Sequence, residues 1–370
     1  MHSMNILFYY PSNKRTISIE SVIIGFKNQG HHVVLLTQSE EAELHDQLHK
    51  NKISTSAYVI KKDNSLVYYF KHLLFLIKFC RINKIDIVYS HLQQANIISV
   101  FAQFLCKSKF YVCRHHSSIS GSDKNINQSL FDKVINVLSK IMIVPSKMVY
   151  KQVHEIEGVN SNKLKLINYG YDFNEYPSPN LEEVEKIKSE FKCKLLLVKI
   201  ARLVPGKRYD ILFTVINKLV KEEKMDIKLL VISEGPLKIE FENYIKDNKL
   251  ENNIYLIGEK FNVIDYLCAS DLVPLLSEAE ASNSVIKEAG LVNKCVIVCK
   301  GVGDFEDYIV NGESGLFMNK ENPLPDLIKY LSDIYKEKIN SENLGLKLHE
   351  SVINNFSIVN VLEKYALLNK

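Results

Sequence analysis

The chain has 370 residues, 46% of them hydrophobic and 24% charged, a composition typical of a globular protein that is long enough for two domains. A formal net charge of +4 permits attraction to phosphates or anionic lipids, but it does not favour nucleic-acid binding, which needs a concentrated basic face. The seven cysteines include no Cys-x-x-Cys pair and mostly lie in apolar runs, which predicts reduced, buried thiols in a cytosolic protein.

Short apolar runs alternate with helical segments through the first half of the chain. The first run, Ile6–Tyr10, has five residues, too few for the hydrophobic region of a signal peptide, so none is expected. A helix is predicted from about Thr16 to Gln29. Further strands are predicted at His32–Thr37, Ala57–Ile60, Ile85–Ser90, Phe110–Cys113 and Ile141–Val144. Apolar strands separated by helices are typical of a parallel sheet covered on both faces, so this half is predicted to be a Rossmann-like α/β domain.

The most apolar segment of the chain is Leu66–Cys80. It is shorter than the roughly 20 residues of a bilayer span, and Lys71, His72 and Lys78 interrupt it. One interpretation is a helix that covers the sheet. The other is an amphipathic, basic surface that docks on a membrane.

Histidine and arginine side chains follow two of the predicted strands. His91 follows Ile85–Ser90, and Arg114, His115 and His116 follow the strand that ends at Cys113. The carboxyl ends of parallel strands are where such folds bind ligands, although an isolated histidine is more often a packed or surface residue. We therefore treat His91, Arg114 and His116 as candidate ligand-binding residues.

The segment Tyr176–Asn180, with two prolines, is typical of a linker between domains. Beyond it the α/β alternation returns. Strands are predicted near Leu195–Ile200, Ile227–Ile232, Ile254–Ile257, Leu272–Leu275 and Cys295–Val298.

Two cations follow the strand Leu195–Ile200. Arg202 and Lys207 lie five positions apart, and each can neutralise a phosphate. The neighbouring Gly206 does not make this a P-loop, because Arg208 stands where that loop needs Ser or Thr. No Asp-x-Asp triplet occurs in the chain, so we expect these cations rather than a metal ion to balance a diphosphate.

Two carboxylates bracket a predicted helix start after the strand Leu272–Leu275. Glu280 and Glu288 have seven residues between them, and each can accept hydrogen bonds from the hydroxyls of a sugar or a ribose. Small residues from Ala281 to Ser284 lie where the helix would begin, so backbone N–H groups there can face an anion. An acidic loop with a solvated helix face explains the same residues. Together with the two cations, however, they favour a site for a nucleotide sugar.

These residues resemble, in order and spacing, the motifs of the retaining glycosyltransferases of family GT4. The resemblance rests on Arg202 with Lys207, Ser233–Pro236, Ile257–Gly258 and the pair Glu280 and Glu288. It implies the α/β fold called GT-B, in which two Rossmann-like domains face each other across a cleft. The implied division is an acceptor-side domain at 1–176, a donor domain at 177–354, and a last helix at 355–370 that packs back on the first domain.

The resemblance also implies the site. Catalytic roles fall to His115, Glu280, Arg202 and Lys207, with His116 as a near alternative to His115. The acceptor side is assigned to His91, Arg114 and His116, with Arg114 as a source of charge for an acceptor phosphate. The donor-binding residues that it implies are Arg202, Lys207, Glu234, Gly235, Pro236, Gly258, Glu280, Asn283, Ser284, Val285 and Glu288. No metal and no other cofactor is expected, since the nucleotide sugar is itself a substrate.

The expected activity is transfer of a sugar from a nucleoside-diphosphate sugar to an acceptor hydroxyl with retention of configuration. The expected acceptor is a glycan or lipid-linked glycan in bacterial capsule, O-antigen or exopolysaccharide synthesis, and the expected location is cytoplasmic, with contact to the inner face of the membrane and none to nucleic acid. Two alternatives remain: a nucleotide-sugar 2-epimerase of the same architecture, and a non-catalytic subunit that binds the donor.

Overall fold

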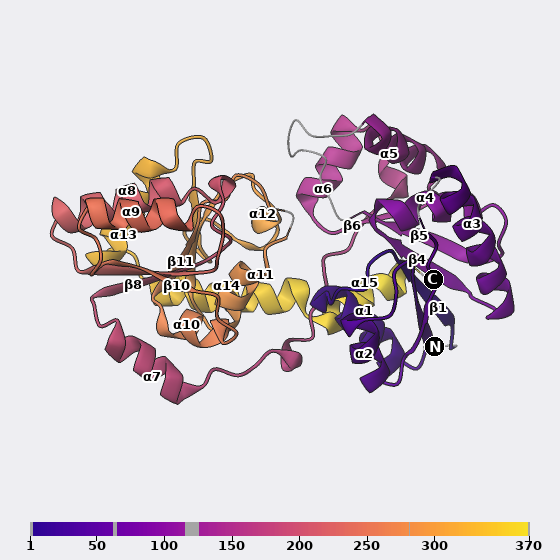
Figure 1. Ribbon diagram of the computed structural model, residues 1–370, viewed down its shortest axis with the longest axis horizontal. Helices are drawn as coiled ribbons and strands as arrows, with labels where there is room; N and C mark the ends of the chain where they lie inside the picture. Colours follow the sequence, from indigo (N-terminus) through magenta and orange to yellow (C-terminus); the bar gives the residue numbers. More distant parts are fainter. Residues whose placement is uncertain (1–2, 62–64, 115–125, 281, 369–370) are drawn as a thin grey trace. The chain divides into compact units, whose positions relative to one another are not determined.

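The computed structural model describes residues 3–61, 65–114, 126–280 and 282–368 (Figure 1). The chain forms two compact units, each with its own parallel sheet. The first unit comprises Met1–Phe173 together with Phe356–Lys370, and the second comprises Asn174–Asn355. The return of the last residues to the first unit is fixed locally by Tyr171, whose backbone exchanges hydrogen bonds with Phe356 and Ile358.

The first unit is built on a seven-stranded parallel sheet with the order β3-β2-β1-β4-β5-β6-β7. Its strands are β1 (Asn5–Tyr10), β2 (His32–Thr37), β3 (Ser54–Ala57), β4 (Ile87–His91), β5 (Lys109–Cys113), β6 (Met142–Val144) and β7 (Leu164–Leu166). The strand predicted at Ala57–Ile60 therefore begins and ends earlier. Its pairing with β2 aligns Val34 with Ser54 and Thr37 with Ala57, and a polar edge strand of this kind gives no hydrophobic signal.

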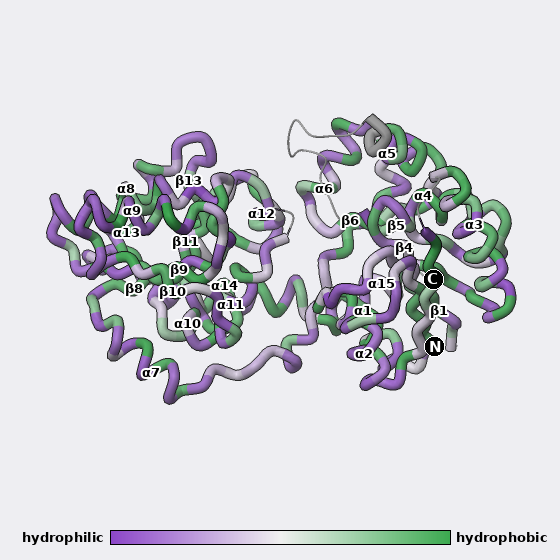
Figure 2. The backbone as a smooth tube through the Cα atoms, viewed as in Figure 1, coloured by the Kyte–Doolittle hydropathy of each residue, from purple (hydrophilic) through white to green (hydrophobic). Residues whose placement is uncertain are grey.

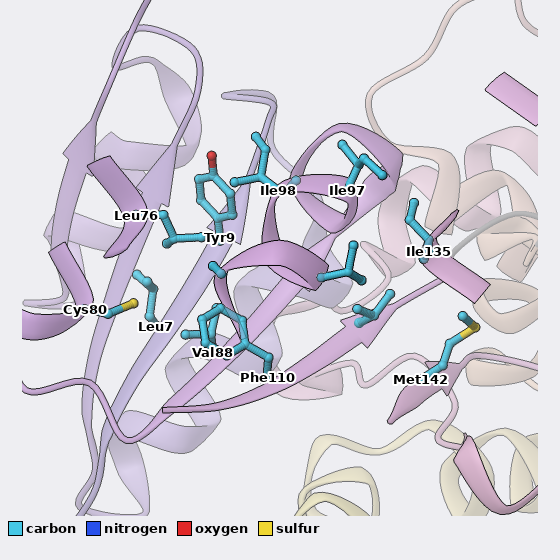
Figure 3. Close-up of a cluster of buried hydrophobic side chains, with 14 of the residues drawn as sticks. Leu7, Tyr9, Leu76, Cys80, Val88, Ile97, Ile98, Phe110, Ile135 and Met142 are labelled. Atoms are coloured by element: carbon cyan, nitrogen blue, oxygen red, sulfur yellow. The ribbon is translucent and has the colours of Figure 1, made fainter. Parts of the chain in front are cut away.

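Helices cover both faces of this sheet. They are α1 (Ile17–Asn28), α2 (Glu43–Lys50), α3 (Ser65–Ile82), α4 (Leu92–Ala102), α5 (Ile126–Leu138), α6 (Lys147–Lys151) and α15 (Ile358–Leu368), with a π-helical turn at Gln152–Ile156 and a 3₁₀ turn at Ser161–Lys163. Successive residues of β1 point to opposite faces. Leu7 and Tyr9 join a core with α3, α4 and α5 (Figure 3), and Ile6 and Phe8 join one with α1, α2 and α15.

The segment Leu66–Cys80, which had two interpretations, lies within the helix α3. Its residues Leu76 and Cys80 are buried against the sheet, so the prediction of a sheet-covering helix is confirmed. Figure 2 colours much of this helix as hydrophobic, and part of that apolar surface faces solvent. Among the described residues, no helix combines the length and the apolar character that a membrane crossing requires.

The second unit repeats the architecture with a six-stranded parallel sheet of order β10-β9-β8-β11-β12-β13. Its strands are β8 (Leu195–Ile200), β9 (Ile227–Ile232), β10 (Ile254–Gly258), β11 (Leu272–Leu275), β12 (Cys295–Cys299) and β13 (Leu316–Met318). Its helices are α7 (Leu181–Glu190), α8 (Tyr209–Lys221), α9 (Lys238–Asp247), α10 (Val263–Ala269), α11 (Ser284–Leu291), α12 (Phe305–Tyr308), α13 (Leu324–Tyr335) and α14 (Ser341–Phe356), with 3₁₀ turns at Phe173–Glu175 and Pro205–Lys207. The two sheets and their helices confirm the predicted α/β class.

The strand order reverses at one place in each sheet, between β1 and β4 and between β8 and β11. Loops diverge there at the carboxyl ends of the strands, and ligands of doubly wound folds bind at such a point. In the second unit the two loops concerned are those that follow β8 and β11. All seven cysteines are free, and four of them are buried: Cys80, Cys113, Cys295 and Cys299.

Candidate functional site

Three loops of the second unit hold one another at the carboxyl edge of the sheet. The Leu203 N–H donates to the Glu234 carbonyl at 3.2 Å, and the Leu237 N–H donates to the Leu203 carbonyl at the same distance, which joins the loops after β8 and β9. The Glu278 N–H donates to the Gly206 carbonyl at 3.0 Å, which joins the loops after β8 and β11. A fixed frame of main-chain hydrogen bonds therefore carries the side chains that the sequence singled out.

Gly235 is what allows the first of these contacts. A Cβ atom at this position would lie 2.5 Å from the Leu203 carbonyl oxygen and 2.7 Å from its nitrogen. Neither backbone atom belongs to a flexible side chain that could move away. The loop after β9 therefore needs glycine here to approach the loop after β8.

Lys207 and Glu280 form an ion pair between their loops. The Lys207 Nζ donates directly to the Glu280 Oε1, and both side chains are largely buried. Gly303 packs behind this carboxylate, because a Cβ atom there would lie 3.1 Å from the Glu280 Cβ. The cation predicted to bind a phosphate and the acid predicted to bind a sugar are thus brought together.

Arg202 and Arg208 occupy the same loop with different surroundings. The Arg202 side chain is exposed at the carboxyl end of β8. Arg208 has a left-handed backbone, with φ of 51°, and its Nε donates to Glu278 Oε1 at 3.0 Å. The two neighbouring pairs on these loops, Lys207 with Glu280 and Arg208 with Glu278, differ in burial, since Glu278 is the more exposed acid.

The start of α11 is held by a buried ion pair that the sequence analysis did not single out. The Lys287 Nζ lies 2.8 Å from Asp304 Oδ2 and donates to Ser282 Oγ at 2.8 Å and to the Asn283 carbonyl at 3.2 Å. The Lys287 and Asp304 side chains are 2% and 0% exposed. The pair spans 17 positions of sequence, and no spacing rule signals such a contact.

The N-terminus of α11 is capped from within. The Asn283 side chain accepts from the Ile286 N–H at 3.2 Å, while Ser284 is exposed and Val285 half-buried in the first turn. Helix capping by asparagine stabilises a helix by about 1 kcal/mol. The predicted donor residues Asn283, Ser284 and Val285 therefore form one ordered turn that follows Glu280.

The Glu288 carboxyl lies one turn further along α11 and is half-buried. Burial raises its pKa, an effect that the Ser284 side chain and the Lys287 charge reduce. Its charge also contributes to the raised pKa of the Tyr176 phenol, which is chiefly due to burial. The carboxylate is thus partly withdrawn from water, and its charge acts on the Tyr176 phenol.

This raised pKa predicts a stability effect for Glu288→Gln. The native state binds a proton more readily than the unfolded state, so the free energy of unfolding falls as pH rises from about 4.5 through the raised pKa. At pH values above the raised pKa, the buried charge of Glu288 continues to lower the free energy of unfolding. We expect Glu288→Gln to raise the melting temperature at pH 7 and to leave it unchanged at pH 4, where both side chains are neutral.

The measurement is thermal unfolding followed by circular dichroism at the two pH values. Glu240→Gln, at an exposed position of α9, is the control and should change neither melting temperature. A lower melting temperature for Glu288→Gln at pH 7 would show that hydrogen bonds to the carboxylate outweigh its burial.

Glu234, on the loop after β9, lies beside Gly258, the last residue of β10. Gly258 has φ of +72°, and a Cβ there would lie 3.1 Å from Glu234 Oε1. The Glu234 carboxylate pairs with Lys238 at 3.0 Å in a partly exposed contact, and Pro236 is exposed in the turn between them. Glu234, Pro236 and Gly258, which were predicted to bind the donor, thus lie at the same edge of the second sheet.

In the first unit, His91 and Arg114 line one pocket at the carboxyl ends of β4 and β5. The His91 ring is buried and stacks on Phe8 with 5.7 Å between ring centroids. Arg114 is buried too, and its charge is balanced by Asp132 at 3.3 Å and Glu157 at 2.9 Å. The structure thus gives Arg114 intramolecular partners. The predicted His115 and His116 lie outside the described residues, as does Ala281.

A metal site is not indicated by side-chain grouping. Within residues 3–61, 65–114, 126–280 and 282–368, no three His, Cys, Asp or Glu side chains cluster closely enough to hold a metal ion.

Two family models match successive parts of the chain. "Glycosyltransferase Family 4" matches residues 17–175, and "Glycosyl transferases group 1" matches residues 182–351. The first span runs from α1 past β7 in the first unit, and the second runs from α7 into α14 and contains all strands of the second sheet.

Curated relatives are glycosyltransferases or sugar-linking synthases. The chain is 24% identical over 225 residues to the poly(ribitol-phosphate) alpha-N-acetylglucosaminyltransferase of Staphylococcus aureus, a match that covers 59% of this chain and 45% of that protein. It is also 24% identical over 250 residues to the N-acetyl-alpha-D-glucosaminyl L-malate synthase of Bacillus anthracis, covering 67% of this chain and 63% of that one. The matched region is thus less than two thirds of either relative.

Solved structures share the fold over the whole chain. Anabaena HepE in complex with UDP superposes with a TM-score of 0.82 at 18% identity and 99% coverage of both chains. A glycosyltransferase from Rickettsia africae gives a TM-score of 0.80 at 19% identity, covering 100% of this chain and 98% of that one. The two family matches show that the chain belongs to the GT4 glycosyltransferases, and the solved structures show that its fold is GT-B.

Proposed function

We propose that the protein is a retaining glycosyltransferase that moves a sugar from a nucleoside-diphosphate sugar to an acceptor hydroxyl without a metal ion. The observation that carries this proposal is the pair of Lys207 and Glu280, mounted on loops that main-chain hydrogen bonds fix at the switch point of the second sheet. A cation for the diphosphate and an acid for the sugar stand next to each other there. The complex of Anabaena HepE with UDP-glucose, a protein of the same fold, supports this class of donor.

The proposed chemistry breaks the bond between the anomeric carbon and the diphosphate oxygen, whose electron pair stays with the diphosphate. Lys207 and Arg202 neutralise the charge that develops on this leaving group. The acceptor oxygen bonds to the anomeric carbon on the face that the diphosphate leaves, and its proton passes to the departing phosphate. Glu280 accepts hydrogen bonds from the donor sugar, and Glu288 from the ribose.

The acceptor class is proposed from the relatives and the first unit. The Staphylococcus aureus relative carries poly(ribitol-phosphate) in its name, and a solved structure of the same fold is a lipopolysaccharide galactosyltransferase. We infer a glycan or lipid-linked glycan of the bacterial cell surface as acceptor, with the pocket beside His91 on the acceptor side. His115 or His116 would line the reacting centre.

The test is a screen of UDP-, GDP- and ADP-linked sugars with the purified protein, in buffer with EDTA, followed by mass spectrometry and anomeric NMR. Release of the nucleoside diphosphate with one hexose or N-acetylhexosamine added to an acceptor, in the donor's configuration, supports the proposal. An isomerised free sugar would indicate the epimerase instead. Binding without turnover of any donor would indicate the non-catalytic subunit.

We also propose that the exposed face of α3 docks on anionic lipid. Leu66 and Phe70 are 82% and 60% exposed there, and Lys71 and Lys78 are exposed on the same helix, which contains no acidic residue. Apolar side chains flanked by cations are what binding at an anionic membrane surface requires.

Co-sedimentation with vesicles tests this surface. Binding is expected to vesicles that contain phosphatidylglycerol and to weaken at least about tenfold in pure phosphatidylcholine or in the double variant Phe70→Ser/Leu74→Ser. Ile239→Ser, at an exposed apolar position of α9, is the control and should bind as the wild type does. Equal binding by the double variant would contradict the assignment.

A further inference from the structure

One lysine of the second unit is enclosed within the sheet. Lys199 lies in β8, at the centre of the sheet between β9 and β11, and its side chain is 0% exposed. Lysine is almost never fully buried unless it is paired, because loss of water disfavours its charged form. Every other residue of β8 is a leucine, valine or isoleucine, so a role in packing alone does not explain it.

The contacts of Lys199 connect it to the loop frame. Its Nζ donates to the carbonyl oxygen of Lys207 at 2.7 Å, and it lies 4.4 Å from the centre of the Tyr209 ring. The hydrogen bond to the Lys207 carbonyl holds the end of the turn Pro205–Lys207 against β8. The contact with the Tyr209 ring favours a positive charge on Lys199, because the face of an aromatic ring attracts cations.

Several ionisable groups surround this ammonium. Burial, with a smaller contribution from the nearby Lys207 charge, lowers the pKa of Lys199 to about 7, and three acidic groups around it limit this shift. These opposing groups are Cys299 on β12, Asp210 on α8 and Glu280 after β11. Near neutral pH the side chain therefore stands between its charged and its neutral form.

We propose that Lys199 is a positioning residue that couples binding of the nucleotide diphosphate to uptake of a proton. The inference rests on the proposed function, which places the diphosphate at Lys207. An anion bound there engages the Lys207 ammonium, and its negative charge stabilises the charged form of the lysine beneath the same turn. A protonated Lys199 in turn holds the Lys207 carbonyl and adds positive charge to the site.

The direction of the pH effect follows from this coupling. Below the pKa of the free protein, Lys199 is charged before and after binding, and no proton is taken up. Above it, the free protein has a neutral lysine and the complex a charged one, so binding takes up a proton and weakens as pH rises. The affinity should fall by up to about tenfold per pH unit between the two pKa values.

Isothermal titration calorimetry with UDP, GDP and ADP tests the coupling. At pH 8 the nucleotides are fully ionised, so titrations in two buffers of different ionisation enthalpy give the number of protons taken up by the protein. We expect this number to approach one for the wild type with the nucleotide that binds. This measurement needs no variant, so it does not depend on a substitution that folds.

Lys199→Met, which keeps the length of the side chain, is the matching variant. It should take up no proton at pH 8, where the wild type takes up close to one. Because it removes a buried charge, its melting temperature at pH 6 should be higher than that of the wild type. Lys228→Met, at a half-buried lysine of β9 in the same sheet, is the control and should keep the proton uptake.

The outcomes separate the two proposals. Nucleotide binding without proton uptake, or equal uptake by the wild type and Lys199→Met, overturns the role of Lys199 and leaves the proposed function standing. Failure of the wild type to bind UDP, GDP or ADP overturns the proposed function and the coupling that rests on it.

Discussion

Replacement of Lys207 by Met is expected to lower kcat/KM by about 10² to 10³, the range for loss of one group that stabilises charge in a transition state. Glu280→Gln is expected to have a loss of the same order, because an amide binds the donor sugar differently from a carboxylate. Lys207 and Glu280 are partly buried and paired, so each substitution also leaves the other charge without its partner. Steady-state kinetics with the donor found in the screen measures both losses.

The double variant Lys207→Met/Glu280→Gln separates catalysis from charge balance. If the two residues only neutralise each other, the double variant should be more active than either single one. If both residues act on the donor, the kcat/KM of the double variant should be no higher than that of the less active single variant. The effects of substituting residues that work as a unit do not add. Recovery of activity in the double variant would therefore contradict the proposed roles.

Glu278→Gln is the matched control for this series. Glu278 belongs to the same loop and also forms an ion pair across to the loop after β8, but it is 54% exposed. Exposed pairs contribute roughly 0 to 1 kcal/mol. Its kcat/KM should stay within about threefold of the wild type.

Lys287→Met is expected to lower the free energy of unfolding by about 3 to 5 kcal/mol, the cost of breaking a buried ion pair from one side. The substitution leaves the fully buried Asp304 carboxylate without its cation and removes the hydrogen bonds to Ser282 and to the Asn283 carbonyl. Equilibrium unfolding in urea, followed by circular dichroism, measures the change.

Two further variants test whether the burial of the ion pair causes this loss of stability. The double variant Lys287→Met/Asp304→Leu should be more stable than Lys287→Met, because apolar residues in place of a buried pair often restore stability. Lys347→Ala, which breaks the exposed pair with Glu350 at 2.9 Å, should change the free energy of unfolding by less than about 1 kcal/mol. A cost for Lys287→Met as small as that of Lys347→Ala would show that water reaches Asp304.

The α/β fold could be predicted from the sequence because it follows from the local pattern of apolar and polar residues. Apolar runs separated by helices gave both sheets, and most strand limits were right to within two residues, as at β1 and β5. The pattern failed at β3, since Ser54–Ala57 is polar and only its pairing with β2 makes it a strand. It also missed β13, which has three residues and a partner in β12.

Long-range contacts at the site were beyond the reach of the sequence. The pairing of Lys207 with Glu280 spans 73 positions, so their proximity depends on the order of β8 and β11 in the sheet. Asp304 gave no sign of its burial, because a lone aspartate in a loop is usually solvated. Lys199 was hidden for the opposite reason, as one polar residue in an apolar run changes the pattern of a strand very little.

The interpretation of Arg114 changes once its neighbours in the structure are known. In the sequence it was a cation after a strand, suited to an acceptor phosphate. In the structure its guanidinium meets Asp132 from α5 and Glu157 from the turn after the π-helical segment. Two carboxylates from distant segments could not be assigned to it from spacing.

The main-chain bonds between Leu203, Glu234, Gly206 and Glu278 have a practical consequence for engineering. Because backbone atoms make these bonds, the side chains of Glu234 and Glu278 can be randomised without dismantling the scaffold that displays them. A library aimed at a new sugar donor should therefore vary the side chains at positions 234 and 278. It should keep Gly235, because any larger residue there would collide with the Leu203 backbone.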